Sequence, residues 1–378
     1  MRLYPGCYHG IENVVHYLAS SLYKAGHHVE LFTVGGSTTR VSKKHWYHKE
    51  EQYKHIHRPW YEATSVTAPH ILYALEVIRR AGDFDIIHDH NSFMGPAMLS
   101  SIGDDLPPAL HTLHEPFTDE RLLGRGIPDN RLLFKHFKPG SRLHFNVISQ
   151  KQLDDAPRQL KGLIHGIVHN GVDLDFLPFS SEKEDYFINV GRIARDKGQG
   201  LAARVCDELG EKFKMAGTVT PTITTARKLA RALADIEHID LWHEDLAYYA
   251  KEILPHTAKN KIEYLGIVTG EAKQKLFAKA KAYLAPYTWE EPFGMSIIDA
   301  LASGTPVIAY RRGALPEIIE HGVNGFLADD ARELRKYIQR IGEIDPAACR
   351  KTVEERFSAD RMAEDYARLY REIIAQSA

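Results

Sequence analysis

The stretch from residue 283 to residue 310 decides the fold of this chain, and it reads Tyr283-Leu-Ala-Pro-Tyr-Thr-Trp-Glu-Glu-Pro-Phe-Gly-Met-Ser-Ile-Ile-Asp-Ala-Leu-Ala-Ser-Gly-Thr-Pro-Val-Ile-Ala-Tyr310. Residues 283–287 form a short apolar run, which is typical of a buried parallel strand. An acidic loop, Glu290-Glu291-Pro292, ends this run, and a helix follows from Phe293. Gly304 and Pro306 end the helix before a second apolar run begins. The order strand, loop, helix, turn, strand predicts an α/β fold with a parallel sheet.

The loop and the start of this helix have the chemistry of an anion site. Gly294 lets the backbone approach a ligand closely, and a helix N-terminus offers unpaired N–H groups and a positive dipole end. Glu291 and Asp299 flank this position. A carboxylate near a phosphate site usually holds sugar hydroxyls. On spacing alone, solvated loop charges and an aspartate that helps the helix to start are an equally good interpretation.

A second candidate phosphate site follows the strand that we expect at Tyr186–Val190. The sequence Gly191-Arg-Ile-Ala-Arg-Asp-Lys-Gly198 places Arg192 and Lys197 in one glycine-flanked turn. Arginine offers a planar bidentate donor and lysine a mobile point charge, and a diphosphate can use both. Ordinary surface charge is the alternative from spacing alone.

Together the two segments resemble the signatures of retaining glycosyltransferases of the GT-B fold, specifically family 4. In the acidic motif of that family, two Glu bracket seven residues, the second and third of which are Phe-Gly. This chain has Asp299 where the family usually has the second Glu, so the carboxylate stands on a shorter stem. Residues 300–308 and 313–319 are similar to the family as well. The resemblance is strong over nearly the whole second half of the chain and looser over the first half.

The resemblance implies an α/β protein with two Rossmann-like domains that face a central cleft, and a C-terminal helix that crosses back to the first domain. We expect an N-terminal acceptor-side domain at residues 1–175. A donor domain that binds the nucleotide sugar follows at residues 176–357, and the returning helix occupies residues 358–378. Residues 175–185, which contain a proline and a charged cluster, are expected to link the domains.

The resemblance also assigns roles to matching positions. Arg192 and Lys197 would neutralise the donor diphosphate, Glu291 would contact the transferred sugar, and Asp299 would hold the ribose hydroxyls. The predicted catalytic residues are His114, Glu291, Arg192 and Lys197. The predicted donor-binding residues are Gly10, Arg192, Lys197, Phe293, Gly294, Met295, Ser296 and Asp299. Gly10 could instead be a plain helix-start glycine.

These roles lead to one functional hypothesis and several alternatives. The hypothesis is a metal-independent enzyme without a cofactor that moves a hexose-type sugar from a nucleotide-diphosphate donor to a hydroxyl acceptor. The resemblance favours a UDP-sugar over a GDP-sugar, and it implies transfer on one face with the leaving phosphate helping to deprotonate the acceptor. A non-catalytic nucleotide-sugar binding protein is the first alternative, because Asp299 replaces Glu and few residues precede the first helix. An NAD-dependent oxidoreductase is weaker, because no Gly-x-Gly-x-x-Gly follows the first strand.

Four histidines suggest a further alternative. We expect strands at Phe84–His90 and Pro108–His114, and ligands bind beyond the carboxyl ends of parallel strands. The histidines at these ends are His88, His90, His111 and His114. Because imidazole is a common metal ligand, a metal-dependent hydrolase is one interpretation. No Cys or carboxylate set with a recognised spacing accompanies them, so contacts to a sugar at His114 and structural histidines elsewhere are the competing interpretations.

The rest of the first domain is less regular. A helix is expected at Ile11–Ala25, and too few residues precede it for a full first strand. Residues 38–70 are polar and aromatic, and we expect an irregular excursion that either lines the acceptor side or forms a local packing patch. We expect Phe145–Ser149 to be the last strand of this domain.

The composition of the chain restricts the number of domains and the class of protein. A chain of 378 residues predicts two domains, and 44% hydrophobic with 26% charged residues is typical of a soluble globular protein. A net charge of −2 gives no electrostatic case for nucleic acid. Three widely spaced cysteines, with no apparent signal peptide or membrane span, predict a cytoplasmic protein. The basic run at 121–142 could contact an anionic inner membrane face peripherally, or it could be a solvated helix face.

Overall fold

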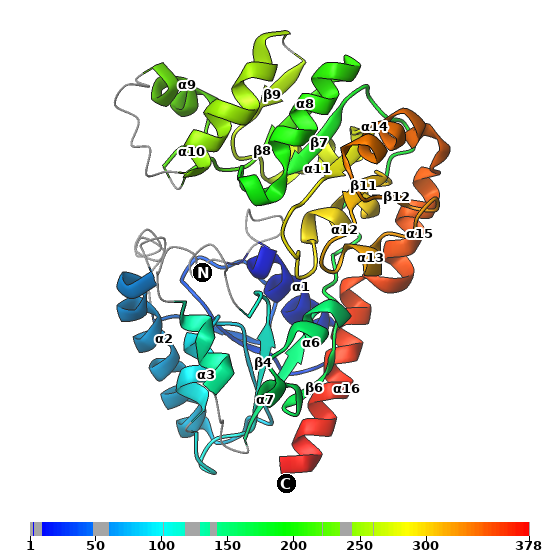
Figure 1. The fold of residues 1–378 in the computed structure, drawn as a ribbon. Coiled ribbons are helices and arrows are strands. Elements are labelled where there is room, and N and C mark those ends of the chain that lie inside the picture. The colour runs from blue at the N-terminus through cyan, green and yellow to red at the C-terminus, as the bar shows by residue number, and fades with distance from the viewer. Residues whose placement is uncertain are drawn as a thin grey trace. The chain divides into compact units, whose positions relative to one another are not determined.

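The computed structural model describes residues 3, 10–47, 60–100, 102–117, 129–136, 142–220, 222–234, 244–259 and 261–377. The chain divides into two compact units (Figure 1). Unit 1 comprises Met1–Gly171 together with Ala359–Ala378, and unit 2 comprises Val172–Ser358. The polypeptide therefore passes between the units twice, once after Gly171 and once after Ser358.

Unit 2 is built on one parallel sheet of six strands. Their order across the sheet is β12-β11-β10-β7-β8-β9. Every residue of β7, β10 and β12 is buried, which explains why these strands are mostly apolar and do not alternate between apolar and polar residues. The strands are β7 (Phe187–Val190), β8 (Phe213–Ala216), β9 (Ile262–Tyr264), β10 (Ala282–Ala285), β11 (Val307–Tyr310) and β12 (Gly325–Ala328).

Helices connect these strands and cover the sheet. Two of them follow the strands that carry the sequence motifs, α8 after β7 and α12 after β10. From β7 the chain continues to β8, toward one edge of the sheet, and from β10 it continues to β11, toward the other edge. Because both crossovers are right-handed, α8 and α12 lie on opposite faces of the sheet. The helices are α8 (Gln199–Leu209), α9 (Ala226–Ala234), α10 (Glu244–Tyr248), α11 (Gly270–Lys279), α12 (Met295–Ala302), α13 (Leu315–Ile318), α14 (Ala331–Arg340) and α15 (Pro346–Arg356).

Unit 1 contains a four-stranded parallel sheet with the order β3-β4-β5-β6, and a separate parallel pair, β1-β2. The prediction that Phe145–Ser149 is the last strand of this domain is wrong, because β6 follows it and pairs with β5. As an edge strand that contains a glycine and is only partly buried, β6 lacks a strong strand pattern. The strands are β1 (Glu30–Phe32), β2 (Lys43–His45), β3 (Ile87–Asp89), β4 (Ala109–Leu113), β5 (Leu143–Val147) and β6 (Ile164–Ile167).

The irregular excursion expected at residues 38–70 is also partly wrong. The polar strand β2 lies inside it, and α2 (Trp60–Ala81) begins eight residues before Ala68, where the sequence predicts the start of a helix that ends at Arg80, and it contains Pro69. Proline in a helix interior normally indicates a break, which is why the pattern predicts a later start. Residues 48–59, and the residues before α1 apart from Leu3, lie outside the described residues.

The remaining helices of unit 1 include the first and the last helix that the structure describes. They are α1 (Gly10–Lys24), α3 (Met94–Leu99), α5 (Leu133–His136), α6 (Gln150–Asp155), α7 (Arg158–Lys161) and α16 (Ala359–Ser377). The last helix, drawn red in Figure 1, packs against α1. The hydroxyl of Tyr366 on α16 lies 3.0 Å from Thr112 Oγ1 on β4 and accepts a hydrogen bond from Asn146 Nδ2 on β5 at 3.1 Å. The predicted return of the C-terminal helix to the first domain is confirmed.

Candidate active site

The strand order of unit 2 locates a ligand site before any side chain is considered. Strands β7 and β10 are neighbours, but the chain proceeds from β7 toward one edge of the sheet and from β10 toward the other. In open parallel sheets, ligands bind at such a reversal, beyond the carboxyl ends of the two strands. The loops that leave β7 and β10 are residues 191–198 and 286–294, which are the two motifs singled out in the sequence.

The two loops are held together through their backbones. Thr288 donates its N–H to the carbonyl of Asp196 at 3.0 Å. Gly198 has φ of +68°, and a Cβ atom there would lie 2.1 Å from the Pro286 carbonyl oxygen. Only glycine permits this approach, so the glycine that ends the basic motif has a packing role.

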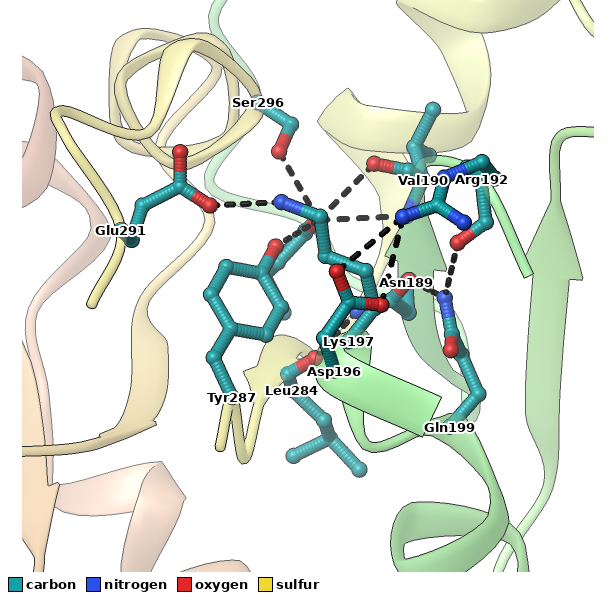
Figure 2. Close-up of polar contacts among 11 residues, drawn as sticks. Asn189, Val190, Arg192, Asp196, Lys197, Gln199, Leu284, Tyr287, Glu291 and Ser296 are labelled. Carbon is teal, nitrogen blue, oxygen red and sulfur yellow. Dashed lines mark hydrogen bonds and ion pairs between the residues drawn. The ribbon is translucent and has the colours of Figure 1, made fainter. Parts of the chain in front are cut away.

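At this junction a lysine and a glutamate from the two motifs form an ion pair (Figure 2). Lys197 Nζ lies 2.6 Å from Glu291 Oε2, and the side chains are 19% and 12% exposed. The ammonium group also faces the rings of Tyr287 and Trp289, at 4.6 and 4.5 Å from their centroids. The loop after β10 thus supplies a carboxylate and two aromatic faces to one cation, which orients the lysine before any ligand is bound.

Arg192 is also paired with carboxylates. Its guanidinium lies 3.0 Å from Asp196 Oδ2 and 2.8 Å from Asp245 Oδ2. The loop that carries it is fixed by Gln199, whose side-chain amide donates to the Arg192 carbonyl at 2.8 Å and to Asn189 Oδ1 at 3.1 Å (Figure 2). The arginine is therefore placed by a buried amide network while its own side chain stays partly open to solvent.

The helix that follows the acidic loop begins at Met295, two residues after the expected start at Phe293. Gly294, with φ of +107°, precedes the first residue of α12. Phe293 is buried in edge-to-face contact with Phe357, which anchors the loop. The amides of Met295 and Ser296 belong to the first helical turn, where no intrahelical carbonyl is available to them. They form the positive end of the α12 dipole, close to the lysine–glutamate pair.

Beneath this turn lies a buried tyrosine that connects both motifs. Tyr283 on β10 accepts from the Val190 N–H at 3.3 Å and donates to its carbonyl at 3.0 Å. The same hydroxyl lies 2.9 Å from Ser296 Oγ and 2.9 Å from the Tyr287 hydroxyl. Burial raises the pKa of Tyr283 to about 12, so it acts here as a neutral hydrogen-bonding group.

The neighbouring Glu290 ties the acidic loop to the segment after β11. Its carboxylate accepts the Gly313 N–H at 2.7 Å and pairs with Arg312 at 3.3 Å. The carbonyl of Glu291 accepts the Ala314 N–H at 2.8 Å. Gly313 has φ of +57°, and a Cβ atom there would lie 2.3 Å from the Glu291 backbone. We call this connection the 290–314 strap.

Asp299 has a partner that sequence reasoning missed. It is buried on α12, and its carboxylate accepts a charge-assisted hydrogen bond from Lys273 Nζ on α11 at 3.0 Å. Both side chains are about as buried as the lysine–glutamate pair. The lysine is one of several in a charged helix, so no sequence signal distinguishes it.

The predicted site residues of unit 1 lie at the start of α1 and at the end of β4. Gly10 is the first residue of α1 and is exposed. His114 follows β4, and its Nε2 lies 2.8 Å from His90 Nδ1. Burial and the nearby His111 lower the pKa of His114 to about 3, so the ring is neutral at neutral pH. A pocket of unit 1 is lined by both histidines together with Ser92, Phe93, Glu115 and Arg131, among others.

The other two histidines have structural partners. His111 Nδ1 lies 2.6 Å from Asp89 Oδ2. His88 Nδ1 lies 2.6 Å from the Tyr370 hydroxyl, and its Nε2 lies 2.7 Å from Thr112 Oγ1. Within the described residues, no group of three or more potential ligands is arranged to hold a metal ion. These contacts favour structural roles for His88 and His111.

Unit 2 thus brings one set of predicted residues together, whereas two predicted residues belong to unit 1. The set in unit 2 is Arg192, Lys197, Glu291, Phe293, Gly294, Met295, Ser296 and Asp299. Gly10 and His114 are the two in unit 1. Sequence reasoning missed the residues that orient the motif side chains, chiefly Asp245, Tyr283, Trp289 and Lys273.

Comparison with known proteins now decides the family. The model for Glycosyltransferase Family 4 matches residues 8–176, and the model for Glycosyl transferases group 1 matches residues 175–356. The chain belongs to the group 1 glycosyltransferases of the family 4 type. The resemblance noted in the sequence is therefore confirmed.

Individual relatives of this group 1 chain are distant. A glycosyltransferase of Methanocaldococcus jannaschii, MJ1607, is 30% identical over 198 residues, which are 50% of this chain and 45% of that protein. The chain likewise spans 44% of the length of a Bacillus subtilis homologue. The chain therefore spans less than half the length of these two relatives.

Solved structures show that this family member has the GT-B fold. Sucrose-phosphate synthase from Thermosynechococcus elongatus superimposes with a TM-score of 0.68 at 18% identity, over 97% of this chain and 94% of that one. The Anabaena protein HepE in complex with UDP and glucose superimposes with a TM-score of 0.66 at 17% identity, over 97% of both chains.

The membrane prediction rests on a segment that is mostly not described. Residues 121–128 and 137–141 of the basic run lie outside the described residues. Of the run's cations, Arg131 pairs with Asp129 at 2.8 Å and Arg142 with Asp104 at 3.3 Å. Among the helices that the structure describes, none combines the length and apolarity needed to cross a membrane.

Proposed function

We propose that the protein is a retaining, metal-independent glycosyltransferase that transfers a hexose-type sugar from a nucleotide-diphosphate donor to a hydroxyl acceptor. The observation that carries this proposal is the contact of Lys197 with Glu291 at 2.6 Å, beside the first turn of α12 and at the reversal of strand order. The proposal takes Lys197 as a phosphate-binding cation and Glu291 as a sugar-binding carboxylate, and these two side chains are in contact. In a nucleotide sugar the phosphate and the transferred sugar are likewise directly linked.

In this proposal unit 2 binds the donor. Arg192, Lys197 and the amides at Gly294, Met295 and Ser296 stabilise the negative charge that grows on the leaving diphosphate. Such preorganised donors commonly contribute a few kcal/mol each to transition-state stabilisation, about 3 kcal/mol for a well-placed one. These groups supply the positive charge that a divalent ion provides in other transferases, which is the basis for proposing metal independence.

The remaining residues contact the neutral parts of the donor. Glu291 binds hydroxyls of the sugar near the reacting carbon, and Asp299 holds the ribose. From unit 1, His114 orients the sugar, and the backbone at Gly10 approaches the sugar or the phosphates. Phe293 keeps the loop in place. A UDP-sugar is the proposed donor, and the Anabaena neighbour, whose structure contains UDP and glucose, supports this choice.

The first arm of the test measures binding. Thermal shift with UDP, GDP, ADP, NAD and sugar conjugates, with and without EDTA, should give a shift with one nucleoside diphosphate that survives EDTA. A shift with NAD alone, or one that EDTA abolishes, would contradict the proposal.

The second arm measures turnover. Arg192→Ala and Lys197→Ala should each lower release of the nucleoside diphosphate by orders of magnitude in the presence of an acceptor, with folding intact. Lys281→Ala is the matched control, because Lys281 pairs with Glu211 at 3.0 Å in the same unit but outside the two loops. Full activity in both site variants would overturn the proposal, and donor binding without turnover across many acceptors would favour a non-catalytic binding protein. The anomeric coupling constant of the product, read by NMR, tests retention.

A further inference from the structure

The segment that follows β3 is held in a strained and heavily anchored conformation. Ser92 has φ of +34°, and among the described residues it is the one non-glycine residue with positive φ. Such a conformation costs roughly 1–3 kcal/mol and persists only where its surroundings enforce it. Here Asn91 donates to Asp89 at 2.6 Å, Ser92 Oγ donates to Glu115 Oε1 at 3.2 Å, and the Gly95 N–H bonds the Asn91 carbonyl at 2.8 Å.

The anchored segment follows His90 directly, and the ring of His90 contacts the ring of His114. The two ring planes are 26° apart and the ring centroids are 5.2 Å apart. His90 Nδ1 and His114 Nε2 lie 2.8 Å apart, which is hydrogen-bonding distance. Burial lowers the pKa of both rings, that of His90 well below its usual value, so both are neutral at neutral pH.

Two neutral imidazoles at this distance share one proton. If His90 Nδ1 donates, His114 must carry its proton on Nδ1, and if His90 Nδ1 accepts, His114 must carry it on Nε2. The ring nitrogen of His114 that is left for a ligand is Nδ1 in either case. Its character, donor or acceptor, is therefore coupled to the tautomer of His90.

His90 packs against a second histidine, His88. The centroids of the two rings are 4.1 Å apart. Both nitrogens of His88 are engaged, with the Tyr370 hydroxyl on α16 at 2.6 Å and with Thr112 Oγ1 on β4 at 2.7 Å. The orientation of the pair is thus supported by the sheet and by the C-terminal helix.

We propose that His90 is a positioning residue for His114: it fixes the rotamer and the tautomer with which His114 meets a sugar hydroxyl in the unit 1 pocket. The proposal rests on the proposed function only in assigning a sugar hydroxyl as the partner of His114. The tautomer itself is a property of the free protein and can be measured without substrate.

The first test is spectroscopic. Long-range ¹⁵N–¹H spectra of the histidine-labelled full chain should show one dominant tautomer for His114 and a ¹⁵N–¹⁵N coupling across its bond to His90. His90→Asn places an amide near the former Nδ1 and should keep a single tautomer, whereas His90→Phe should give a mixture. An unchanged His114 tautomer in His90→Phe, or no coupling in the unsubstituted protein, would overturn the proposal even if His90→Phe folds poorly.

The second test is kinetic and uses a matched control. His144 Nδ1 lies 2.7 Å from His165 Nε2, so His144→Phe breaks a similar histidine pair in the same unit outside the pocket. We expect kcat/KM to fall roughly tenfold in His90→Phe, the equivalent of one lost orienting hydrogen bond, and to recover most of that loss in His90→Asn. The His144→Phe variant should match the unsubstituted protein. Equal turnover in His90→Phe would contradict the positioning role, while absence of any transferase activity in the unsubstituted protein would overturn the proposed function and leave the spectroscopic result standing.

Discussion

Each cation that we assign to the diphosphate already has a carboxylate partner. Arg192 contacts Asp196 and Asp245, and Lys197 contacts Glu291. The site therefore carries little net charge in the free protein, and a diphosphate must compete with these carboxylates for the two cations. Under the proposed function, this competition lowers the affinity of the site for the donor diphosphate.

Replacing one competing carboxylate should strengthen binding. Because Arg192 is partly exposed, its pair with Asp245 contributes about 1 kcal/mol or less. Asp245→Asn should therefore lower the Kd for UDP by up to about fivefold, which isothermal titration calorimetry can measure. Glu208→Gln is the control, because Glu208 pairs with Arg335 in the same unit outside the two loops. Weaker UDP binding in Asp245→Asn would show that the carboxylate positions the arginine instead of competing for it.

For individual side chains, the sequence predicted the motif residues but not their partners. Arg192, Lys197, Glu291 and Asp299 stand at motif spacing, whereas Asp245 and Lys273 lie on other helices with no spacing relation to the motifs. Their contacts arise only when α10 and α11 are placed by the sheet. Spacing within a segment cannot report such encounters.

Among the elements, strands β7, β10 and β12 of unit 2 were predictable because each is buried on both faces and is mostly apolar. Strands β2 and β6 were not, because one is a polar run and the other is a partly buried edge strand with a glycine. The start of α2 was hidden by Pro69. The 290–314 strap could not be anticipated either, because it joins loops that follow different strands.

Strands β3 and β4 should make unit 1 sensitive to mild acid. Burial lowers the pKa of His88 and His114 to about 3 from the ordinary 6.5, so the unfolded chain binds protons between these values and the folded unit does not. The stability that they contribute is full above pH 6.5 and is lost as the pH falls toward 3, by at most about 1.4 kcal/mol per pH unit for each histidine.

Thermal unfolding between neutral pH and about pH 5 checks this expectation, because most carboxylates titrate below that window. The midpoint of the transition that involves unit 1 should decrease as the pH decreases. A midpoint that stays constant between pH 6.5 and about pH 5 would mean that these rings take up protons in the folded protein.

In the whole molecule, α16 is part of the core of unit 1, although 187 residues of unit 2 (Val172–Ser358) separate it from the rest of that unit. Tyr366 on this helix is fully buried and bonds to β4 and β5. The family resemblance predicted the return of this helix. The helical pattern of residues 358–375 alone did not indicate which unit it joins.

Substitutions of Tyr366 can separate the contribution of packing to stability from that of the hydrogen bonds. Tyr366→Phe removes the hydroxyl and should cost about 1 kcal/mol of unfolding free energy, whereas Tyr366→Ala also leaves a cavity and should cost about 3–5 kcal/mol. Urea unfolding measures both, with Tyr23→Ala on the exposed side of α1 as the control that should change little. Equal, small losses in both Tyr366 variants would show that α16 is not required for the core of unit 1.

The discontinuity of unit 1 also sets an order of events during synthesis. Unit 2 is one uninterrupted segment, so its six strands can pair as soon as residue 358 has left the ribosome. Most of unit 1 is made before unit 2, but it lacks α16 until residues 359–377 have been made, and until then Thr112 and Asn146 lack the hydroxyl of Tyr366. The usual vectorial order, in which the N-terminal domain folds first, is thus reversed for the final step. A helix made after unit 2 thus completes a unit whose sheet was made before it.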